Sequence, residues 1–440
     1  MLKRTPKTLL AITLVALALR LVFAGAVLGL NAPFRGDESD YHAIAANLAA
    51  GEGHVKHVGI PTAARPPLYS IALAGVYAIF GPSVPAARIF QVLLGALLVP
   101  LTYLLARRIF SQAVALIAAG VVALNPFLIF ISAYLMTENL YTAILLLAMI
   151  VLTDALRLGF ARGGQLVLAG LLAGAATLTR PHGLLFAAFT AAAVLVLGRG
   201  RPARRVLGAA LFLLTLAAVL GPWVLRNEIR MGRPILLTTH GGITFYESNN
   251  RLILEEPAFR GAIVVPRTGV PDYDRRLAGK DELAFDREAR RMGWEFVREN
   301  PGAMPKLFAW KFLRFWRFRS DIGFSGVKSG FWWDKESTLG ALASRLDVGF
   351  VYNAVIIPLF VMGLILTLAR RTGACFLHMN LLVHTIMALL FYGSLRARIP
   401  IEPVLAVYAA AGVIWLAGKV RPGKNTAPLG REAASADTAS

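Results

Sequence analysis

The sequence predicts an all-α polytopic membrane protein. Of its 440 residues, 57% are hydrophobic and only 16% are charged, and the mean hydropathy is +0.61. Several apolar runs reach or approach the roughly 20 residues with which a helix spans the hydrocarbon core of a bilayer. A soluble fold is therefore not a competing interpretation.

The charge and cysteine content narrow the possible partners. The formal net charge is +21, and most basic residues flank the apolar runs. At such positions Lys and Arg orient a membrane protein and contact anionic lipid, so the sequence predicts the lipid bilayer as a partner and no nucleic acid. The one cysteine, Cys375, lies in an apolar run. It excludes a disulfide framework or a cysteine metal site within the chain.

Basic residues also set the predicted topology. Lys3, Arg4 and Lys7 precede the first run, which predicts a cytoplasmic N-terminus and an uncleaved first helix. The run 68–80 has only about 13 residues, which is too few to span the bilayer. Counting it as a span would also place the later basic loops outside the cell. We therefore interpret it as an interfacial or re-entrant helix. About ten spans remain, with ten to thirteen as the range, and both termini are predicted in the cytoplasm. The spans are 8–30, 86–106, 113–134 (with a kink at Asn125-Pro126), 140–156, 166–179, 183–197, 206–225, 348–368, 376–392 and 401–416.

These spans divide the chain into four parts. Residues 1–225 form an N-terminal transmembrane module with a first extracytoplasmic loop at 31–85, in which 37–50 can form an amphipathic helix. Residues 226–345, richer in charge, glycine and proline, are predicted to form an extracytoplasmic loop domain, with a basic, aromatic amphipathic helix over 301–319. Residues 346–420 return to transmembrane helices, and 421–440 read as a disordered cytoplasmic tail.

The polar residues that interrupt this apolar sequence converge on the extracytoplasmic side. Arginine binds phosphate through bidentate, charge-assisted hydrogen bonds, and a carboxylate can take a proton from an attacking hydroxyl. The set therefore suits a lipid-linked anion and an acid/base step. It comprises Asp37 and Glu38, Arg65, Glu138, Arg180 with His182, Arg226 with Asn227, and Arg396 with Arg398.

Several of these residues have alternative explanations. Asp37 and Glu38 begin a predicted helix, where the helix dipole favours carboxylates without any catalytic role. Arg20, near the middle of the first span, is predicted to face the protein interior and pair there. His42, His54 and His57 lie near acidic residues, but their spacing matches no dedicated metal motif, so solvated loop histidines are the favoured interpretation.

Ordered motifs along residues 1–420 resemble the GT-C superfamily of polyprenyl-phosphate-sugar-dependent glycosyltransferases. The resemblance is to the bacterial branch grouped with protein O-mannosyltransferases (glycosyltransferase family 39) and lipid A aminoarabinose transferases. The matching elements are Gly36-Asp37-Glu38 with Tyr41, Arg65-Pro66-Pro67-Leu68-Tyr69, Asn125-Pro126, Thr137-Glu138-Asn139-Leu140, Leu178-Thr179-Arg180-Pro181, Pro222-Trp223-Val224-Leu225-Arg226-Asn227, Thr239-His240-Gly241-Gly242 through Asn249-Asn250, and Arg398-Ile399-Pro400-Ile401-Glu402-Pro403.

The resemblance implies a GT-C type fold and an inverting transfer of sugar from a polyprenyl-phosphate donor to an unknown extracytoplasmic acceptor at the plasma (bacterial inner) membrane. It implies that Asp37 activates the acceptor and that Glu38 supports it or helps to hold a divalent metal; no organic cofactor is expected. Glu138 completes the predicted catalytic set. Predicted phosphate-binding residues are Arg65, Arg180, Arg226, Arg396 and Arg398, and predicted substrate-binding residues are Tyr41, Tyr69, His182, Asn227, Asn249 and Asn250.

Two departures and two alternatives accompany this prediction. The aminoarabinose transferases carry a metal-holding glutamate where this chain has Ala64, which weakens a metal site and transfer to lipid A. The 226–345 segment is too short for the extra soluble domain of secretory O-mannosyltransferases. The alternative functions are a transporter or flippase of polyprenyl-linked sugars, which commonly shows internal repeats that we do not find here, and a non-catalytic envelope assembly protein.

Overall fold

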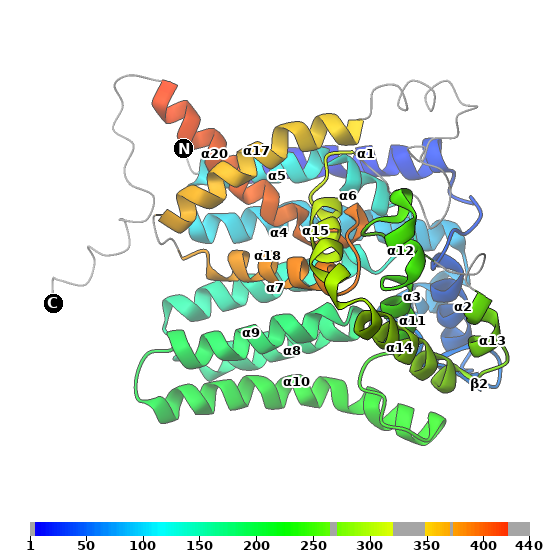
Figure 1. Cartoon of the computed structure of the whole chain (residues 1–440). Coiled ribbons are helices and arrows are strands. Elements are labelled where there is room, and N and C mark those ends of the chain that lie inside the picture. The colour runs from blue at the N-terminus through cyan, green and yellow to red at the C-terminus, as the bar shows by residue number, and fades with distance from the viewer. Residues whose placement is uncertain (1–4, 265–270, 320–347, 370–372, 421–440) are drawn as a thin grey trace.

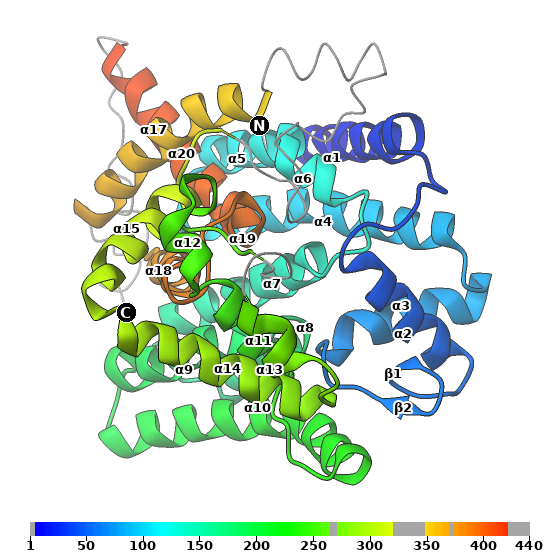
Figure 2. The same cartoon turned by 45° about the vertical axis from the view of Figure 1, so that its right-hand side comes forward.

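The structure is a computed structural model that describes residues 5–264, 271–319, 348–369 and 373–420. Its helices form a bundle of roughly parallel members with a cap of shorter helices at one end (Figures 1 and 2). Within these residues, six helices are long and apolar enough to cross a membrane, and five apolar helices are shorter. The polytopic all-α prediction is confirmed.

The bundle is built from both halves of the chain. Its helices are α1 (Thr5–Val22), continued by the π-helix η1 (Phe23–Leu28), α4 (Val84–Ile109), α5 (Gln112–Leu124), α6 (Pro126–Ile131), α7 (Glu138–Arg157), α8 (Gly163–Thr179), α9 (His182–Leu197), α10 (Pro202–Met231), α17 (Val348–Ala369), α18 (Cys375–Leu390) and α20 (Glu402–Val420).

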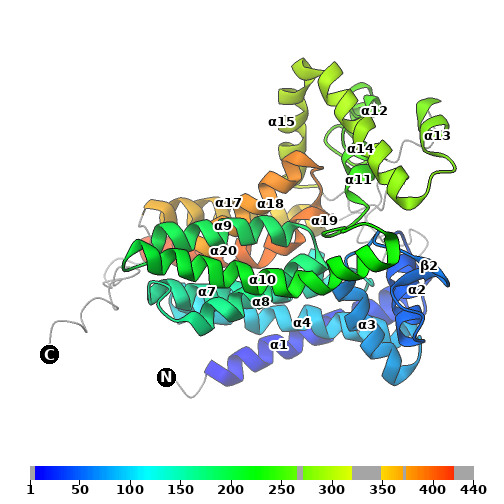
Figure 3. The ribbon, with the colours of Figure 1, turned by 90° about the horizontal axis from the view of Figure 1, so that it is seen from below.

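The cap gathers three parts of the chain at the end of the bundle opposite the start of α1 and the end of α20 (Figure 3). The first loop gives α2 (Glu38–Ala49), a small antiparallel hairpin of β1 (Val55–His57) and β2 (Ile60–Pro61), and α3 (Pro67–Phe80). The segment after α10 gives α11 (Gly241–Glu247), α12 (Arg251–Glu255), η2 (Pro257–Phe259), α13 (Pro271–Leu277), α14 (Glu282–Glu299), η3 (Pro301–Ala303) and α15 (Met304–Phe315). The last piece is α19 (Leu395–Arg398) with η4 (Ile399–Ile401).

Glycines allow the bundle helices to approach closely. A Cβ on Gly170 would lie 2.6 Å from the carbonyl oxygen of Phe212, and one on Gly363 would lie in the backbone of Tyr408. These positions join α8 to α10 and α17 to α20. Small residues at helix crossings are the usual means of packing where lipid removes the hydrophobic drive for association.

The predicted kink at Asn125-Pro126 is a complete break between α5 and α6. Pro126 has no N–H for the carbonyl of Val122, and the N–H of Phe127 donates instead to the Asn125 side chain at 2.8 Å. Arg20 supplies the missing donors, since its guanidinium donates to the carbonyl oxygens of Val122 and Ala123 at 3.2 Å. The buried Arg20 therefore has a structural role, as the sequence indicated.

Two predicted boundaries need correction, and one element was not predicted. The predicted helix over 301–319 is shorter, because its regular part is α15 (Met304–Phe315), and it buries Lys311 and Phe315 against the protein. The span predicted to end at residue 225 continues through Pro222 to Met231. The hairpin β1–β2 had no predicted counterpart. The tail 421–440 and residues 265–270 and 320–345 of the predicted loop domain lie outside the described residues.

Candidate active site

A cavity of about 510 Å³ lies where the cap meets the bundle. Its wall combines the start of α2, the 64–66 loop, the α8–α9 turn, the segment before α11, and the α18–α19 connection. Six of the predicted site residues line it: Asp37, Tyr41, Arg65, Arg180, His182 and Arg396.

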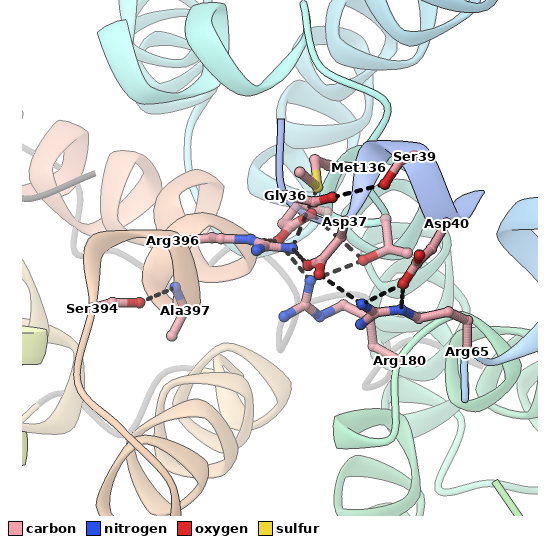
Figure 4. Close-up of polar contacts among 12 residues, drawn as sticks. Gly36, Asp37, Ser39, Asp40, Arg65, Met136, Arg180, Ser394, Arg396 and Ala397 are labelled. Atoms are coloured by element: carbon pink, nitrogen blue, oxygen red, sulfur yellow. Dashed lines mark hydrogen bonds and ion pairs between the residues drawn. The ribbon is translucent and has the colours of Figure 1, made fainter. Parts of the chain in front are cut away.

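Asp37 lies at the centre of the polar side chains that face this cavity (Figure 4). It precedes α2 but makes no capping hydrogen bond with its side chain. Its Oδ1 contacts Nη2 of Arg65 at 2.7 Å, and its Oδ2 contacts Nη2 of Arg396 at 2.9 Å. Asp37 therefore lies at the start of α2, where the dipole favours it, but both of its carboxylate oxygens pair with arginines and neither caps the helix.

Two arginines dominate the electrostatics of Asp37. Burial by itself raises the pKa of its carboxyl, but the guanidinium groups of Arg396 and Arg65 outweigh that effect and hold the pKa well below its usual range. In this state Asp37 is a firmly ionised carboxylate and a weak base. The side chain is 27% exposed, so it remains accessible to a ligand in the cavity.

Glu138 shares Arg396 with Asp37 and also holds Arg180, the third arginine of the cavity. It is fully buried at the first turn of α7, and its Oε1 contacts Nη1 of Arg180 and Nε of Arg396, each at 2.7 Å. Nη1 of Arg180 also donates to Thr137 Oγ1 at 2.9 Å. Arg65, Asp37, Arg396, Glu138 and Arg180 thus form a continuous chain of alternating charge along the cavity.

Asp40 and Lys56 extend this chain away from the cavity. Asp40 accepts from Arg65 at 3.0 Å and from Lys56 at 2.6 Å. Burial by itself raises the pKa of Asp40, but its contacts with Lys56 and Arg65 lower the pKa by more, so the net shift is downward. Arg65 is therefore fixed by two carboxylates, of which only Asp37 reaches the cavity.

Glu38 points the other way and lies outside the cavity. Its two carboxylate oxygens accept from the backbone N–H groups of Arg35 and Leu135, each at 2.9 Å, and Arg88 lies 3.6 Å away. Burial raises the pKa of Glu38 despite these contacts. Both oxygens are therefore used to join the first loop to the α6–α7 connection, and they do not fit the predicted metal.

Other predicted residues also have structural partners instead of facing the cavity. Arg226 lies over Trp223 and donates to the carbonyl oxygens of Thr62 and His54 at 2.9 and 2.6 Å. Arg398 is buried between Glu402 and Asn353, with contacts of 2.8 and 2.6 Å. Neither arginine is placed to meet a phosphate in this cavity.

Tyr69 and the predicted asparagines lie outside the cavity as well. Tyr69 accepts from Gln91 at 2.7 Å, and Asn227 donates to the carbonyl of Ile235 at 2.9 Å. Asn249 accepts from the buried Lys311 at 2.9 Å, and burial lowers the pKa of that lysine to about 7. Asn250 donates to backbone carbonyls of α11. These side chains shape the cap that surrounds the site.

The cavity also contains residues to which the sequence analysis gave no role, including His240, Thr244, Glu247 and Tyr392. His240 lies in the Thr239-His240-Gly241-Gly242 motif of the family resemblance, and this motif was the one feature of the sequence that could have indicated a place in the site. Burial, aided by the charge of Arg65, lowers the pKa of His240 to about 4, so its imidazole is neutral at pH 7. Within the described part of the chain, no three His, Cys, Asp or Glu side chains gather as a metal site would require.

Comparisons with known proteins agree with this architecture. The family of dolichyl-phosphate-mannose-protein mannosyltransferases matches residues 64–225. The archaeal oligosaccharyltransferase AglB from Archaeoglobus fulgidus, in complex with an inhibitory peptide and a dolichol-phosphate, superposes with a TM-score of 0.54 and 15% identity. That match covers 96% of this chain and 52% of AglB. This chain has the GT-C fold.

Two further solved structures were also matched to this chain. The same oligosaccharyltransferase tethered to an acceptor peptide with the NVT sequon gives a TM-score of 0.55 at 15% identity, over 94% of this chain and 50% of that one. The chain thus spans about half the length of these oligosaccharyltransferases. ArnT from Cupriavidus metallidurans bound to undecaprenyl phosphate gives 0.42 at 15% identity, over 91% and 77%. No curated protein sequence matches the chain significantly.

Proposed function

We propose that this protein is an inverting glycosyltransferase that moves a sugar from a polyprenyl-phosphate donor to an acceptor on the extracytoplasmic side of the plasma membrane. The observation that carries the proposal is the position of Asp37, which faces Arg65 and Arg396 in a cavity at one end of an apolar helix bundle. A carboxylate in this position can take a proton from a nucleophile, and the arginines beside it can bind a lipid-linked phosphate.

The reaction follows from these groups. An acceptor hydroxyl or amide attacks the anomeric carbon from the face opposite the phosphate, so the new bond forms as the bond from that carbon to the phosphate oxygen breaks. The bonding electrons leave with the polyprenyl phosphate, and the proton of the nucleophile passes to Asp37. Arg180 and Arg396 stabilise the negative charge that develops on the leaving phosphate.

The ion pairs impose an order on this reaction. Arg396 lies between Asp37 at 2.9 Å and Glu138 at 2.7 Å. A donor phosphate that binds Arg396 competes with Asp37 for the guanidinium, and Asp37 then becomes more basic because it loses a positive neighbour. Glu138, which is fully buried, keeps Arg396 and Arg180 in place during the exchange. Donor binding therefore activates the base that the acceptor requires.

Transfer from a labelled polyprenyl-phosphate sugar to an envelope extract, with the purified protein in nanodiscs, tests the proposal. Asp37→Asn should lower turnover by about 10²–10⁴-fold, the usual contribution of a general base. Asp40→Asn is the matched control, because Asp40 also pairs with Arg65 but does not line the cavity. Absence of transfer by the wild-type protein, or full turnover by Asp37→Asn, would refute the proposal. Movement of unchanged donor across the bilayer of sealed proteoliposomes would identify a transporter.

A further inference from the structure

A second cleft opens beside the active-site cavity, between the segment that follows α10 and the outer helix α14. Its volume is about 450 Å³, and its lining includes the apolar side chains of Ile235, Leu237 and Leu283. Three arginines line it, Arg233 from the segment after α10 and Arg287 and Arg290 from α14. None of the functions assigned above uses this cleft.

The charge of the cleft is unbalanced. Asp286 is the one carboxylate in its lining, and it is already engaged by the backbone N–H of Gly242 at 2.5 Å and by Arg290 at 2.7 Å. Arg233 and Arg287 are exposed, and no carboxylate among the described residues forms an ion pair with either. Two positive charges in a partly apolar lining therefore have no ion-pair partner, which suits an anionic group on a partly apolar molecule.

The cleft and the cavity share a wall. Thr238 lines both, and the neighbouring Thr239 lines the cleft. Glu282, at the start of α14, accepts from Thr62 Oγ1 at 2.6 Å, from the N–H of Ala63 at 2.9 Å and from Thr239 Oγ1. One carboxylate thus ties α14 to the loop that carries Arg65 and to the segment that carries His240. A molecule held in the cleft would be positioned against the cavity by a fixed wall.

Solvated arginines on an outer helix are common and need no ligand. Arg291 on the same helix illustrates that case, since it is 65% exposed and pairs with Glu288 and Glu295. Arg233 and Arg287 differ from it because they face one concave surface from two different segments and lack such partners. Their placement therefore favours a ligand over simple solvation.

We propose that this cleft binds an anionic group, a phosphate or carboxylate, of the acceptor and presents its nucleophile to Asp37 past Thr238. The inference rests on the proposed glycosyltransferase function. It assigns the acceptor to a chemical class, an anionic molecule with an apolar portion, and it predicts that donor binding is independent of the cleft.

The test uses the full chain in nanodiscs of neutral phosphatidylcholine, with a labelled polyprenyl-phosphate sugar and an envelope extract separated by anion exchange into neutral and anionic fractions. Label should enter the anionic fraction. The double variant Arg233→Gln/Arg287→Gln should raise the acceptor concentration at half-maximal rate by about two- to thirtyfold, as expected for two exposed charge contacts. Affinity for the donor and its slow hydrolysis without acceptor should stay unchanged. Arg291→Gln is the matched control and should behave as the wild type.

The outcomes separate this inference from the proposed function. Transfer into the neutral fraction alone, or a double variant with wild-type acceptor dependence, overturns the anionic acceptor while leaving the glycosyltransferase in place. Loss of all transfer by the wild-type protein instead overturns the proposed function. If the double variant differs from the wild type only when phosphatidylglycerol is added to the nanodiscs, the cleft binds bilayer headgroups, and the acceptor assignment is wrong.

Discussion

Replacement of Glu38 by glutamine separates a structural carboxylate from a catalytic one. Glu38 is fully buried, and each of its oxygens accepts a backbone N–H, from Arg35 and from Leu135. Glutamine keeps one acceptor oxygen but turns an NH2 group toward the other N–H. One charge-assisted hydrogen bond is lost and a buried donor is left without a partner, which costs about 1.5–3 kcal/mol.

The loss of negative charge beside Arg88 adds to this cost. Arg88 keeps hydrogen bonds to the carbonyl oxygens of Leu30, Ala32 and Ala133, at 3.1, 2.9 and 2.5 Å, which limits the penalty. The cost of leaving Arg88 without its carboxylate is therefore smaller than the roughly 3–5 kcal/mol seen when one partner of an isolated buried ion pair is removed. We therefore expect Glu38→Gln to lower the free energy of unfolding by about 2–4 kcal/mol.

Thermal unfolding can be followed through the reactivity of Cys375 with a fluorogenic thiol reagent, because this half-buried side chain is the one cysteine in the chain. The unfolding midpoint of Glu38→Gln should fall, while turnover per folded molecule stays within about tenfold of the wild type, since Glu38 does not touch the cavity. A variant with wild-type stability but turnover reduced a hundredfold or more, or with a changed metal requirement, would refute this reasoning and restore the catalytic or metal-binding role.

Three further predictions follow from other contacts. Arg398→Met should destabilise the protein by about 3–5 kcal/mol, because it leaves the carboxylate of Glu402 buried without its cation. The double variant Arg398→Met/Glu402→Met should recover much of this loss. A stable single variant with impaired donor binding would instead favour a phosphate-binding role for Arg398. Gly393→Ala should reduce both stability and turnover, because its Cβ would lie 2.0 Å from a backbone carbonyl of α15 and would displace the segment that carries Arg396. The control Gly75→Ala has open space around it and should be neutral or stabilising by about 0.5–1 kcal/mol. Equal effects of the two substitutions would contradict this packing. The pKa of His240 is about 4 in the folded protein and about 6.5 in the unfolded chain, so the unfolded state binds more protons. The contribution of neutral His240 to the free energy of unfolding should be complete above pH 6.5 and decline as the pH falls toward 4. The unfolding midpoint of His240→Gln should therefore depend less on pH over this interval.

The sequence predicted the helices of this protein more completely than its site. Apolar runs of sufficient length have few alternatives to helices, and the break at Asn125-Pro126 was predictable because proline removes a backbone donor. The hairpin β1–β2 was missed because it is very short and carries no alternating pattern. The end of α10 was misplaced because a change of composition marks a change of environment, which here falls inside a helix.

Within the site, the sequence identified acidic and basic residues beside the apolar spans but could not assign their partners. Asp37 and Glu38 are adjacent in the chain, yet at about 100° per helical residue their side chains point in different directions. One faces the arginines of the cavity and the other joins two loops. Arg396 and Arg398 differ in the same way, with Arg396 in the cavity and Arg398 in a buried network.

The sequence by itself determined that the chain is a polytopic membrane protein, where its helix break lies, and that carboxylates and arginines gather beside the apolar spans. Those properties depend on local composition and on the cost of burying unpaired polar groups in lipid. Only the tertiary structure decided which arginines face Asp37. That ion pair joins residues 359 positions apart, and whether two such side chains meet depends on the packing of every helix between them.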